Sequence, residues 1–180
     1  MALRTSVFIA TSLDGFISRL DGNIDWLHEA NMIVPTGEDC GYKEFASSVD
    51  VMVMGRNTFD LVLTFDGWPY GDKRLIVLSS KPVEITEALR NNVSDSSEAP
   101  IDLVKRLEAE GFQHAYIDGG ITIQRFLRAR LIDEITITLI PVLLGTGRPL
   151  FGPLEEDLNL RLIQSKAYEF GFVQLKYGVV

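Results

Sequence analysis

The chain has 180 residues, of which 46% are hydrophobic and 23% charged, a composition typical of a single soluble domain spanning residues 1–180. The net charge of −8 argues against nucleic acid or an anionic membrane as the main partner, and one cysteine with two histidines argues against a disulfide or a zinc site, so that no bound metal is expected. We expect a cytoplasmic protein, because residues 1–6 lack the apolar core of a signal peptide and no apolar run approaches the ~18 residues of a membrane span.

Strands and helices alternate along most of the chain. The expected strands in this part are 7–10, 50–54, 74–79 and 114–118, and the expected helices are 38–49, 56–63, 100–110 and one that follows residue 118. A short helical turn is expected at 24–31, and the polar segment 91–100 is expected to form a short edge strand or a loop. A long strand rich in β-branched residues follows at 134–144, and then an antiparallel pair at 158–167 and 170–177. This order predicts an α/β fold with a mostly parallel sheet and antiparallel C-terminal strands.

Three of the expected strands end in small, hydroxyl-bearing or cationic residues, at positions 55–58, 79–81 and 119–120. Ligands of open α/β sheets bind at the carboxyl ends of the strands, so these ends are predicted to lie at one edge. Arg56 at a helix start suits a phosphate, residues 79–81 suit a second one such as an adenosine 2′-phosphate, and the paired glycines allow a close approach to the backbone. Each end alone has an ordinary explanation as a turn, but together they predict one elongated ligand that carries phosphates.

The chain lacks the common nucleotide-binding and hydrolase signatures. No G-x-G-x-x-G motif follows the first expected strand, and the G-x-G at 145–147 precedes Arg148 and Pro149 rather than a helix. There is no P-loop motif, and no set of serine, histidine and acid predicts a hydrolase. The histidines at positions 28 and 114 are expected to be surface residues or to have structural hydrogen-bond partners.

Four segments, in order, resemble dihydrofolate reductase, and the resemblance covers most of residues 5–152. They are Phe8-Ile9-Ala10 with Asp14-Gly15-x-Ile17, Met54-Gly55-Arg56-Asn57-Thr58-Phe59, Val77-Leu78-Ser79-Ser80-Lys81-Pro82, and Ile117-Asp118-Gly119-Gly120. In detail the chain is more similar to the reductase domain of bifunctional riboflavin-biosynthesis proteins, the RibD C-terminal domain, and to its stand-alone relatives. The segments typical of these relatives are 14–17, 25–27, 131–135 and 141–151. The resemblance implies a dihydrofolate reductase-like fold with three layers.

The resemblance also implies that NADPH is the hydride donor and that the residues at the strand ends bind it. Those carried over to this chain as cofactor-binding residues are Ala10, Ile17, Gly55, Arg56, Thr58, Leu78, Ser79, Ser80, Lys81, Gly119, Gly120, Ile121 and Thr122. In this pattern, residues 55–58 and 119–122 hold the phosphates, and residues 78–81 contact the adenosine end. The backbone at positions 10 and 17 contacts the nicotinamide amide.

The catalytic candidate is Asp39, which lies sixteen residues before Gly55, the spacing that dihydrofolate reductases show for their buried carboxylate. On a helix over 38–49 it would share a face with Tyr42 and point inward, and burial would raise its pKa as a proton donor requires. The alternative is that Glu38 and Asp39 are simply acidic residues that stabilise a helix N-terminus.

Two functions remain open from the sequence. The first is an NADPH-dependent reductase of a small heterocycle, of the 5-amino-6-(5-phosphoribosylamino)uracil reductase or dihydrofolate reductase type. The extra residues 35–37, absent from dihydrofolate reductase, favour a pyrimidine or pterin-like substrate over folate. The second is an NADP-binding module without catalysis.

Three further expectations follow from the same resemblance. Loop 14–23 would be a flexible lid that excludes water from the nicotinamide ring. Asp14 and Asp25 are weaker acid candidates. Because stand-alone relatives are commonly dimers, we expect a homodimer, for which strand 135–144 and the C-terminal pair could supply the contact or simply form core.

Overall fold

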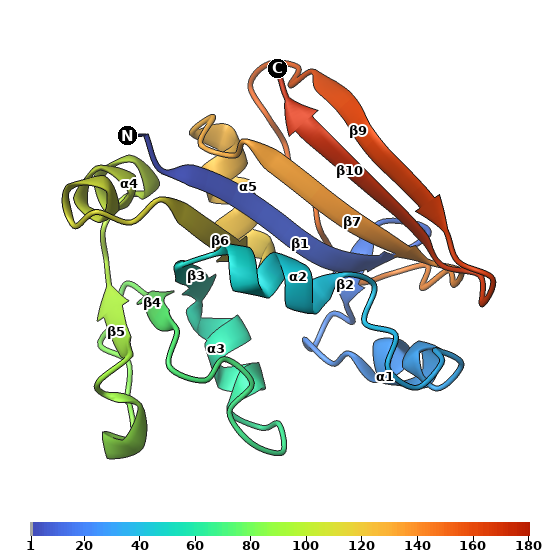
Figure 1. Ribbon diagram of the computed structural model, residues 1–180, viewed down its shortest axis with the longest axis horizontal. Helices are drawn as coiled ribbons and strands as arrows, with labels where there is room; N and C mark the ends of the chain where they lie inside the picture. Colours follow the sequence, from blue (N-terminus) through green and yellow to red (C-terminus); the bar gives the residue numbers. More distant parts are fainter. Residues whose placement is uncertain (1) are drawn as a thin grey trace.

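The computed structural model describes residues 2–180 and places an eight-stranded sheet between two layers of helices (Figure 1). The strands are β1 (Arg4–Ser12), β2 (Phe16–Ser18), β3 (Val51–Gly55), β4 (Arg74–Leu78), β5 (Val93–Ser96), β6 (His114–Asp118), β7 (Glu134–Ile140), β8 (Arg148–Pro149), β9 (Leu160–Ala167) and β10 (Val173–Val179). The helices are α1 (Asp25–Asn31), α2 (Tyr42–Ser48), α3 (Arg56–Val62), α4 (Pro100–Ala109) and α5 (Gly120–Arg128), with a 3₁₀ turn at Glu87–Leu89.

The strand order in the main sheet is β5-β4-β3-β6-β1-β7-β10-β9, and β2 pairs separately with β8. The strands from β5 to β7 in this order pair in parallel, whereas β10 runs antiparallel to both β7 and β9. The predicted fold class is therefore confirmed. The strand predicted over 134–144 ends earlier than expected. Strand β7 stops at Ile140, because the next residue, Pro141, has no N–H group to continue the ladder.

The helix predicted over 38–49 also begins later than expected. Two consecutive residues before it, Cys40 and Gly41, have φ angles of 52° and 81°, in the left-handed region. A right-handed helix cannot run through two such residues, so α2 starts at Tyr42. The apolar stripe of the sequence was correct, but it did not reveal this break.

The two faces of the sheet are covered by different helices (Figure 1). Residues alternate between the faces, so that Ile117 of β6 packs in one core cluster with Phe126 of α5, and the preceding Tyr116 packs in another with Phe59 of α3. Helices α4 and α5 cover the first face, and α2 and α3 cover the second. This arrangement forms the three predicted layers.

The direction in which successive strands are added across the sheet reverses at β6, which lies between β3 and β1. The connection that leaves β1 leads to β3, and the connection that leaves β6 leads through α5 to β7 on the far side of β1. The carboxyl ends of these strands therefore meet at a topological switch point, where open α/β sheets bind ligands. Among residues 2–180, no helix is long and apolar enough to cross a bilayer.

Candidate active site

The first turns of α3 and α5 lie against each other at the carboxyl edge of β3 and β6. A Cβ atom added to Gly119 would lie 2.5 Å from the hydroxyl oxygen of Thr58, and one added to Gly55 would lie 2.8 Å from the hydroxyl oxygen of Thr122. Gly119 also has a φ of 89°, which L side chains rarely adopt. Gly119 therefore requires glycine, and a side chain at Gly55 would displace the Thr122 hydroxyl. Two of the three predicted strand ends thus share one place in the fold.

The helix starts at this place are suited to an anion. First-turn N–H groups lack partners within the helix and attract negative charge. The first turns of α3 and α5 carry no acidic side chain, whereas those of α1, α2 and α4 contain Asp25, Glu44 and Asp102. Arg56 Nε lies 3.6 Å from Asp60 Oδ2, but both side chains are exposed, so this weak ion pair leaves the guanidinium able to meet a phosphate.

The third strand end is adjacent to these helix starts and more open. The register of β3 and β4 pairs Gly55 with Leu78, so the segment 79–81 follows beside the start of α3. The Ser79 hydroxyl oxygen accepts a hydrogen bond from the backbone N–H of Lys81 at 3.2 Å, which fixes the turn. The two side chains that follow Ser79 are exposed. A hydroxyl and an ammonium group are thus free to reach a ligand at this edge.

The loop predicted as a lid is tied to the segment that follows β7. The Asp14 carboxylate accepts hydrogen bonds from the backbone N–H groups of Leu144 (3.1 Å) and Gly145 (2.8 Å). The Leu150 N–H donates to the Gly15 carbonyl at 3.0 Å, and the short strands β2 and β8 pair beside this contact. The loop is therefore held as one unit with the segment 141–150.

Two residues predicted to contact the nicotinamide lie on neighbouring elements. A Cβ on Gly120 would lie 2.6 Å from Cδ1 of Ile17, so Ile17 in β2 packs against the start of α5. Ala10 in β1 is paired with Thr138 of β7. By contrast, Ile121 is 67% exposed and points into solvent at the first turn of α5.

The structure contradicts the environment expected for Asp39. This residue lies before α2 rather than on it, and its carboxylate accepts hydrogen bonds from the backbone N–H groups of Gly41 and Lys43, both at 3.0 Å. These hydrogen bonds, first that from Lys43, lower the pKa of Asp39 below its usual value. The expected rise in pKa is wrong, because the carboxylate is stabilised by N–H groups instead of being buried without them.

A different carboxylate, Asp118 at the end of β6, has the property expected of Asp39. It lies next to Gly119 at the helix starts, and burial raises its pKa to about 6, although its Oδ1 accepts a hydrogen bond from the Gly119 N–H at 2.8 Å. In the sequence Asp118 belongs to the motif at 117–120, of which only the glycines were predicted to bind the cofactor. The signal available in the sequence was an acidic residue at the end of the strand predicted over 114–118, and the structure shows that the four residues before it, 114–117, are buried.

Aromatic residues from distant segments share the face on which Asp118 lies. The Tyr116 hydroxyl donates to the Phe8 carbonyl at 2.8 Å, and the Phe8 ring lies 5.8 Å from the ring of Tyr42. Burial, followed by the negative charge of Asp118, raises the pKa of Tyr42 to about 12 and raises that of Tyr70 further. The carboxyl group thus lies among neutral tyrosines, in surroundings suited to a flat ring.

Both histidines have the roles expected from the sequence. His114 is buried, its Nε2 lies 2.8 Å from the Ser6 hydroxyl and its Nδ1 lies 3.0 Å from the Ser48 carbonyl, while His28 is exposed on α1. Burial lowers the pKa of His114, so it is a neutral structural residue at pH 7.

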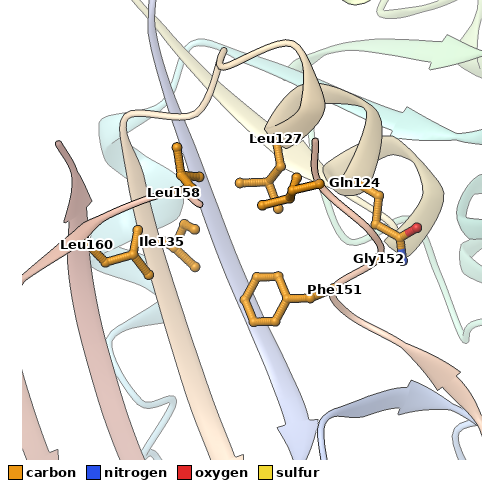
Figure 2. A pocket seen from close by; sticks show the side chains of 8 residues that line it. Gln124, Leu127, Ile135, Phe151, Gly152, Leu158 and Leu160 are labelled. Atoms are coloured by element: carbon orange, nitrogen blue, oxygen red, sulfur yellow. The ribbon is translucent and has the colours of Figure 1, made fainter. Parts of the chain in front are cut away.

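A cavity of about 180 Å³ opens away from this edge, between α5, β7 and the segment before β9 (Figure 2). It is lined by Gln124, Leu127, Ile135, Phe151, Gly152, Leu154, Leu158 and Leu160. None of the residues predicted to bind the cofactor lines it, so this cavity is a separate feature of the molecule.

Comparisons with known proteins support the same fold and identify the family of the chain. The family model of the RibD C-terminal domain matches residues 5–173. The uncharacterized protein YwjB of Bacillus subtilis (strain 168) is 37% identical over 181 residues, which cover 98% of both chains. The crystal structure of the "Putative riboflavin biosynthesis protein" of Shewanella sp. PV-4 is 43% identical, covers 99% of both chains and superimposes with a TM-score of 0.91.

A more distant structure is a bifunctional protein of Thermotoga maritima. It is a diaminohydroxyphosphoribosylaminopyrimidine deaminase/5-amino-6-(5-phosphoribosylamino)uracil reductase, with a TM-score of 0.73 at 12% identity. The alignment covers 99% of the present chain but 57% of the Thermotoga chain, so this likeness concerns the fold of one part of that protein. The family match over most of the chain and the high identity to YwjB agree, and the chain belongs to the RibD C-terminal domain family.

Proposed function

We propose that this protein is an NADPH-dependent reductase of a small heterocyclic substrate, of the 5-amino-6-(5-phosphoribosylamino)uracil reductase type. The observation that carries the proposal is the position of Asp118. A carboxyl group whose pKa burial raises to about 6 lies directly beside two helix starts suited to phosphates. A binding module would need the helix starts but not the acid.

The donor groups at the edge of the sheet fit NADPH. The N–H groups at the start of α5, together with the hydroxyl-lined start of α3, would hold the pyrophosphate. The Arg56 guanidinium and the exposed segment 79–81 would meet the 2′-phosphate, which distinguishes NADPH from NADH. Ala10 and Ile17 would meet the nicotinamide amide through their backbone groups. When bound there, NADPH supplies a hydride.

The substrate would occupy the face of the sheet on which Phe8, Tyr42 and Asp118 lie. The aromatic rings would hold a flat heterocycle, and Asp118 in its protonated form would donate a proton to the nitrogen that becomes more basic as the adjacent carbon is reduced. Loop 14–23, held against the segment 141–150, would keep water from this position.

The test measures coenzyme binding and turnover separately. Calorimetry should detect NADPH binding, and the decay of NADPH absorbance should follow addition of an aminouracil ribosylamine. The panel should also include dihydrofolate, dihydropterins and quinonoid pterins, because turnover of one of these instead would correct the substrate class. NADPH binding without turnover of any of them would favour the module without catalysis. No NADPH binding at millimolar concentration would overturn the proposal.

A further inference from the structure

Two residues one turn apart on α5, Gly120 and Gln124, face the short strands β2 and β8. A Cβ atom added to Gly120 would lie 2.6 Å from Cδ1 of Ile17 in β2 and 3.7 Å from the carbonyl oxygen of Pro149 in β8. The Nε2 group of Gln124 donates hydrogen bonds to the carbonyl oxygens of Pro149 at 3.1 Å and Leu150 at 3.2 Å. Because residues i and i+4 of a helix share one face, this strand pair is held on a single side of α5.

The amide group of Gln124 lies against the backbone that follows β8. A Cβ atom added to Gly152 would lie 2.6 Å from Oε1 and 2.9 Å from Cδ of Gln124, and Figure 2 shows the amide end beside Gly152. Leu150 is buried in the same core cluster as Phe126 and Leu127 of α5. The segment 149–152 is thus fixed to α5 by one buried leucine and by one polar side chain.

This segment in turn holds the loop predicted to be the lid. The Leu150 N–H donates to the Gly15 carbonyl at 3.0 Å, and Arg148 Nε donates to the Leu20 carbonyl at 3.0 Å. Between these two contacts β2 pairs with β8. The Asp14 carboxylate binds a different part of the chain, the N–H groups at 144 and 145. Loop 14–23 therefore has two anchors, one on the segment after β7 and one that reaches α5 through Gln124.

We infer that Gln124 is a positioning residue, which couples the helix that would hold the coenzyme phosphates to the lid that would cover the nicotinamide ring. The effect on turnover rests on the proposed function, whereas the link between α5 and loop 14–23 does not. Gln124 lies four residues beyond the first residue of α5, or about 6 Å along the helix axis. A rigid helix over this distance sets where the lid lies relative to a pyrophosphate bound at the helix start.

The hydrogen-bonding capacity of Gln124, more than its bulk, carries this role. Its side chain borders the cavity that is otherwise lined by apolar residues and Gly152, where a methionine would pack equally well (Figure 2). A methionine has no N–H group for the two carbonyl oxygens, so it would leave β8 without its polar link to α5. A lid held loosely in this way would admit water and broaden the range of geometries for hydride transfer.

The first test measures the link itself and needs no coenzyme. Gln124→Met keeps the length of the side chain and removes both N–H groups. The amide of Leu150, which donates to Gly15, should exchange hydrogen at least about fivefold faster in this variant, as followed by nuclear magnetic resonance. The amides of residues 144 and 145 should stay as protected as in the wild type, because Asp14 holds them separately.

The second test measures turnover and coenzyme binding in the same variant. Gln124→Met should lower kcat by about tenfold or more and change the NADPH dissociation constant by less than about threefold, because a loosened lid affects the chemical step more than phosphate binding. The substrate is the aminouracil ribosylamine, or the compound of the panel that the wild type reduces. Gln124→Lys, whose ammonium group can donate to the same carbonyl oxygens, should retain most of the turnover.

Gln164→Met is the matched control, and urea denaturation establishes that each variant is folded. Gln164 is exposed on β9, and its side chain forms no hydrogen bond with any other of residues 2–180, so neither exchange at residue 150 nor turnover should change.

Three results would overturn the inference. They are an unchanged exchange rate of the Leu150 amide in Gln124→Met, a kcat that this variant retains in full, and an NADPH affinity that falls as much as kcat does. The last would show that Gln124 only stabilises α5, and a Gln124→Lys variant as slow as Gln124→Met would lead to the same conclusion. A wild type that binds no NADPH would overturn the proposed function instead, and the exchange of the Leu150 amide would still decide whether Gln124 holds the lid.

Discussion

The hydroxyl group of Thr58 lies directly against Gly119, so that the helix starts after β3 and β6 are in contact. A Cβ atom at position 119 would approach the Thr58 oxygen to 2.5 Å, closer than real Cβ atoms come to any neighbour. This contact joins two of the three strand ends that the sequence indicated. Gly119 is therefore a structural requirement of the place where the two helices start, and the proposed function also makes it a point of close approach for a ligand.

Gly119→Ala is expected to reduce the free energy of unfolding by about 2–4 kcal/mol, because the positive φ alone costs about 1–2 kcal/mol and the clash with Thr58 adds to it. The control is Gly111→Ala, where φ is 91° but nothing lies within 4 Å of the added Cβ. This variant should lose only the part of the free energy of unfolding that comes from backbone strain. Urea denaturation measures both. Equal losses in the two variants would show that the Thr58 side chain moves aside at no cost in stability. Thr58→Ala should restore part of the stability lost in Gly119→Ala but none of that lost in Gly111→Ala.

The strand, turn and helix at 51–59 were predictable because their signals are local. Four apolar residues form a buried strand, and Gly55 then marks the change from a strand period to a helical one. The antiparallel C-terminal pair was predictable for the same reason. The end of β7 is set by a single residue, Pro141, whose missing N–H stops the ladder inside an otherwise continuous run of strand-forming residues.

The acid could not be chosen from the sequence, because its environment depends on segments that lie far apart along the chain. The apolar stripe after Asp39 gives no sign that Cys40 and Gly41 are left-handed, so the helix was extended over the wrong residue. Asp118 acquires its raised pKa from burial, which comes from the packing of α2 and the segment around Tyr70 on β6. The pair of β2 with β8 was missed because strands of three and two residues have no sequence period.

The proton donor is expected to be Asp118. Asp118→Asn should lower kcat/KM by about 100-fold or more and leave the NADPH dissociation constant nearly unchanged, because a general acid acts only in the chemical step. In the wild type, kcat/KM should fall as the pH rises through about 6, where the donor loses its proton. Asp118→Asn should lack this dependence. An unchanged profile in the variant would remove Asp118 from the proton-transfer step.

The pH dependence of the free energy of unfolding tests the same carboxyl group, Asp118, without any substrate. The native pKa of about 6 lies above the ordinary 3.8, so the native state holds its proton more tightly than the unfolded state. Stability from this group is complete below pH 4 and declines as the pH rises to about 6, by up to about 3 kcal/mol for a shift of two units. Asp118→Asn should show no such decline, which urea midpoints between pH 4 and 7 would reveal.

Asp39→Asn is expected to keep most of the turnover, in contrast to Asp118→Asn. The amide oxygen of asparagine still accepts a hydrogen bond from a backbone N–H, so the start of α2 remains stabilised. Because the pKa of Asp39 is lowered, its contribution is present above its ordinary pKa and is lost as the pH falls through the lowered value. A loss of turnover in this variant with NADPH binding intact would restore Asp39 as the acid.

Arg56 is expected to distinguish NADPH from NADH. Arg56→Ala should weaken NADPH binding by about tenfold or more and NADH binding by less, because a guanidinium contributes most where it meets the extra phosphate. Asp60→Asn is the matched control: it removes the exposed partner that lies 3.6 Å from Arg56, so NADPH affinity should be unchanged or higher. Titration of each variant with both coenzymes measures the ratio. Equal losses for the two coenzymes in Arg56→Ala would place the 2′-phosphate elsewhere.

The anchoring of loop 14–23 is expected to depend on the charge of Asp14. Asp14→Asn replaces one acceptor oxygen by a donor, which cannot meet the N–H of Gly145 and Leu144 together with the Ser12 hydroxyl. The amides of residues 144 and 145 should then exchange hydrogen at least several-fold faster, as measured by mass spectrometry. Asp21→Asn is the control, because Asp21 accepts a hydrogen bond from the nearby Asn23 N–H and from no other of residues 2–180, so this variant should leave the amides of residues 144 and 145 unchanged.

The pH dependence of the same anchor follows from the charge of Asp14. The hydrogen bond from the Ser12 hydroxyl, followed by those from the two amides, holds the pKa of Asp14 below its ordinary 3.8. A lowered pKa means that the anchor is complete at pH 7 and is released only as the pH falls below about 4. Exchange at residues 144 and 145, corrected for the intrinsic rate, should therefore stay constant from pH 8 to 5 in the wild type. Faster exchange within that range would show that another titrating group holds the loop. If residues 144 and 145 remained protected in Asp14→Asn, the pairing of β2 with β8 would be sufficient to hold the loop.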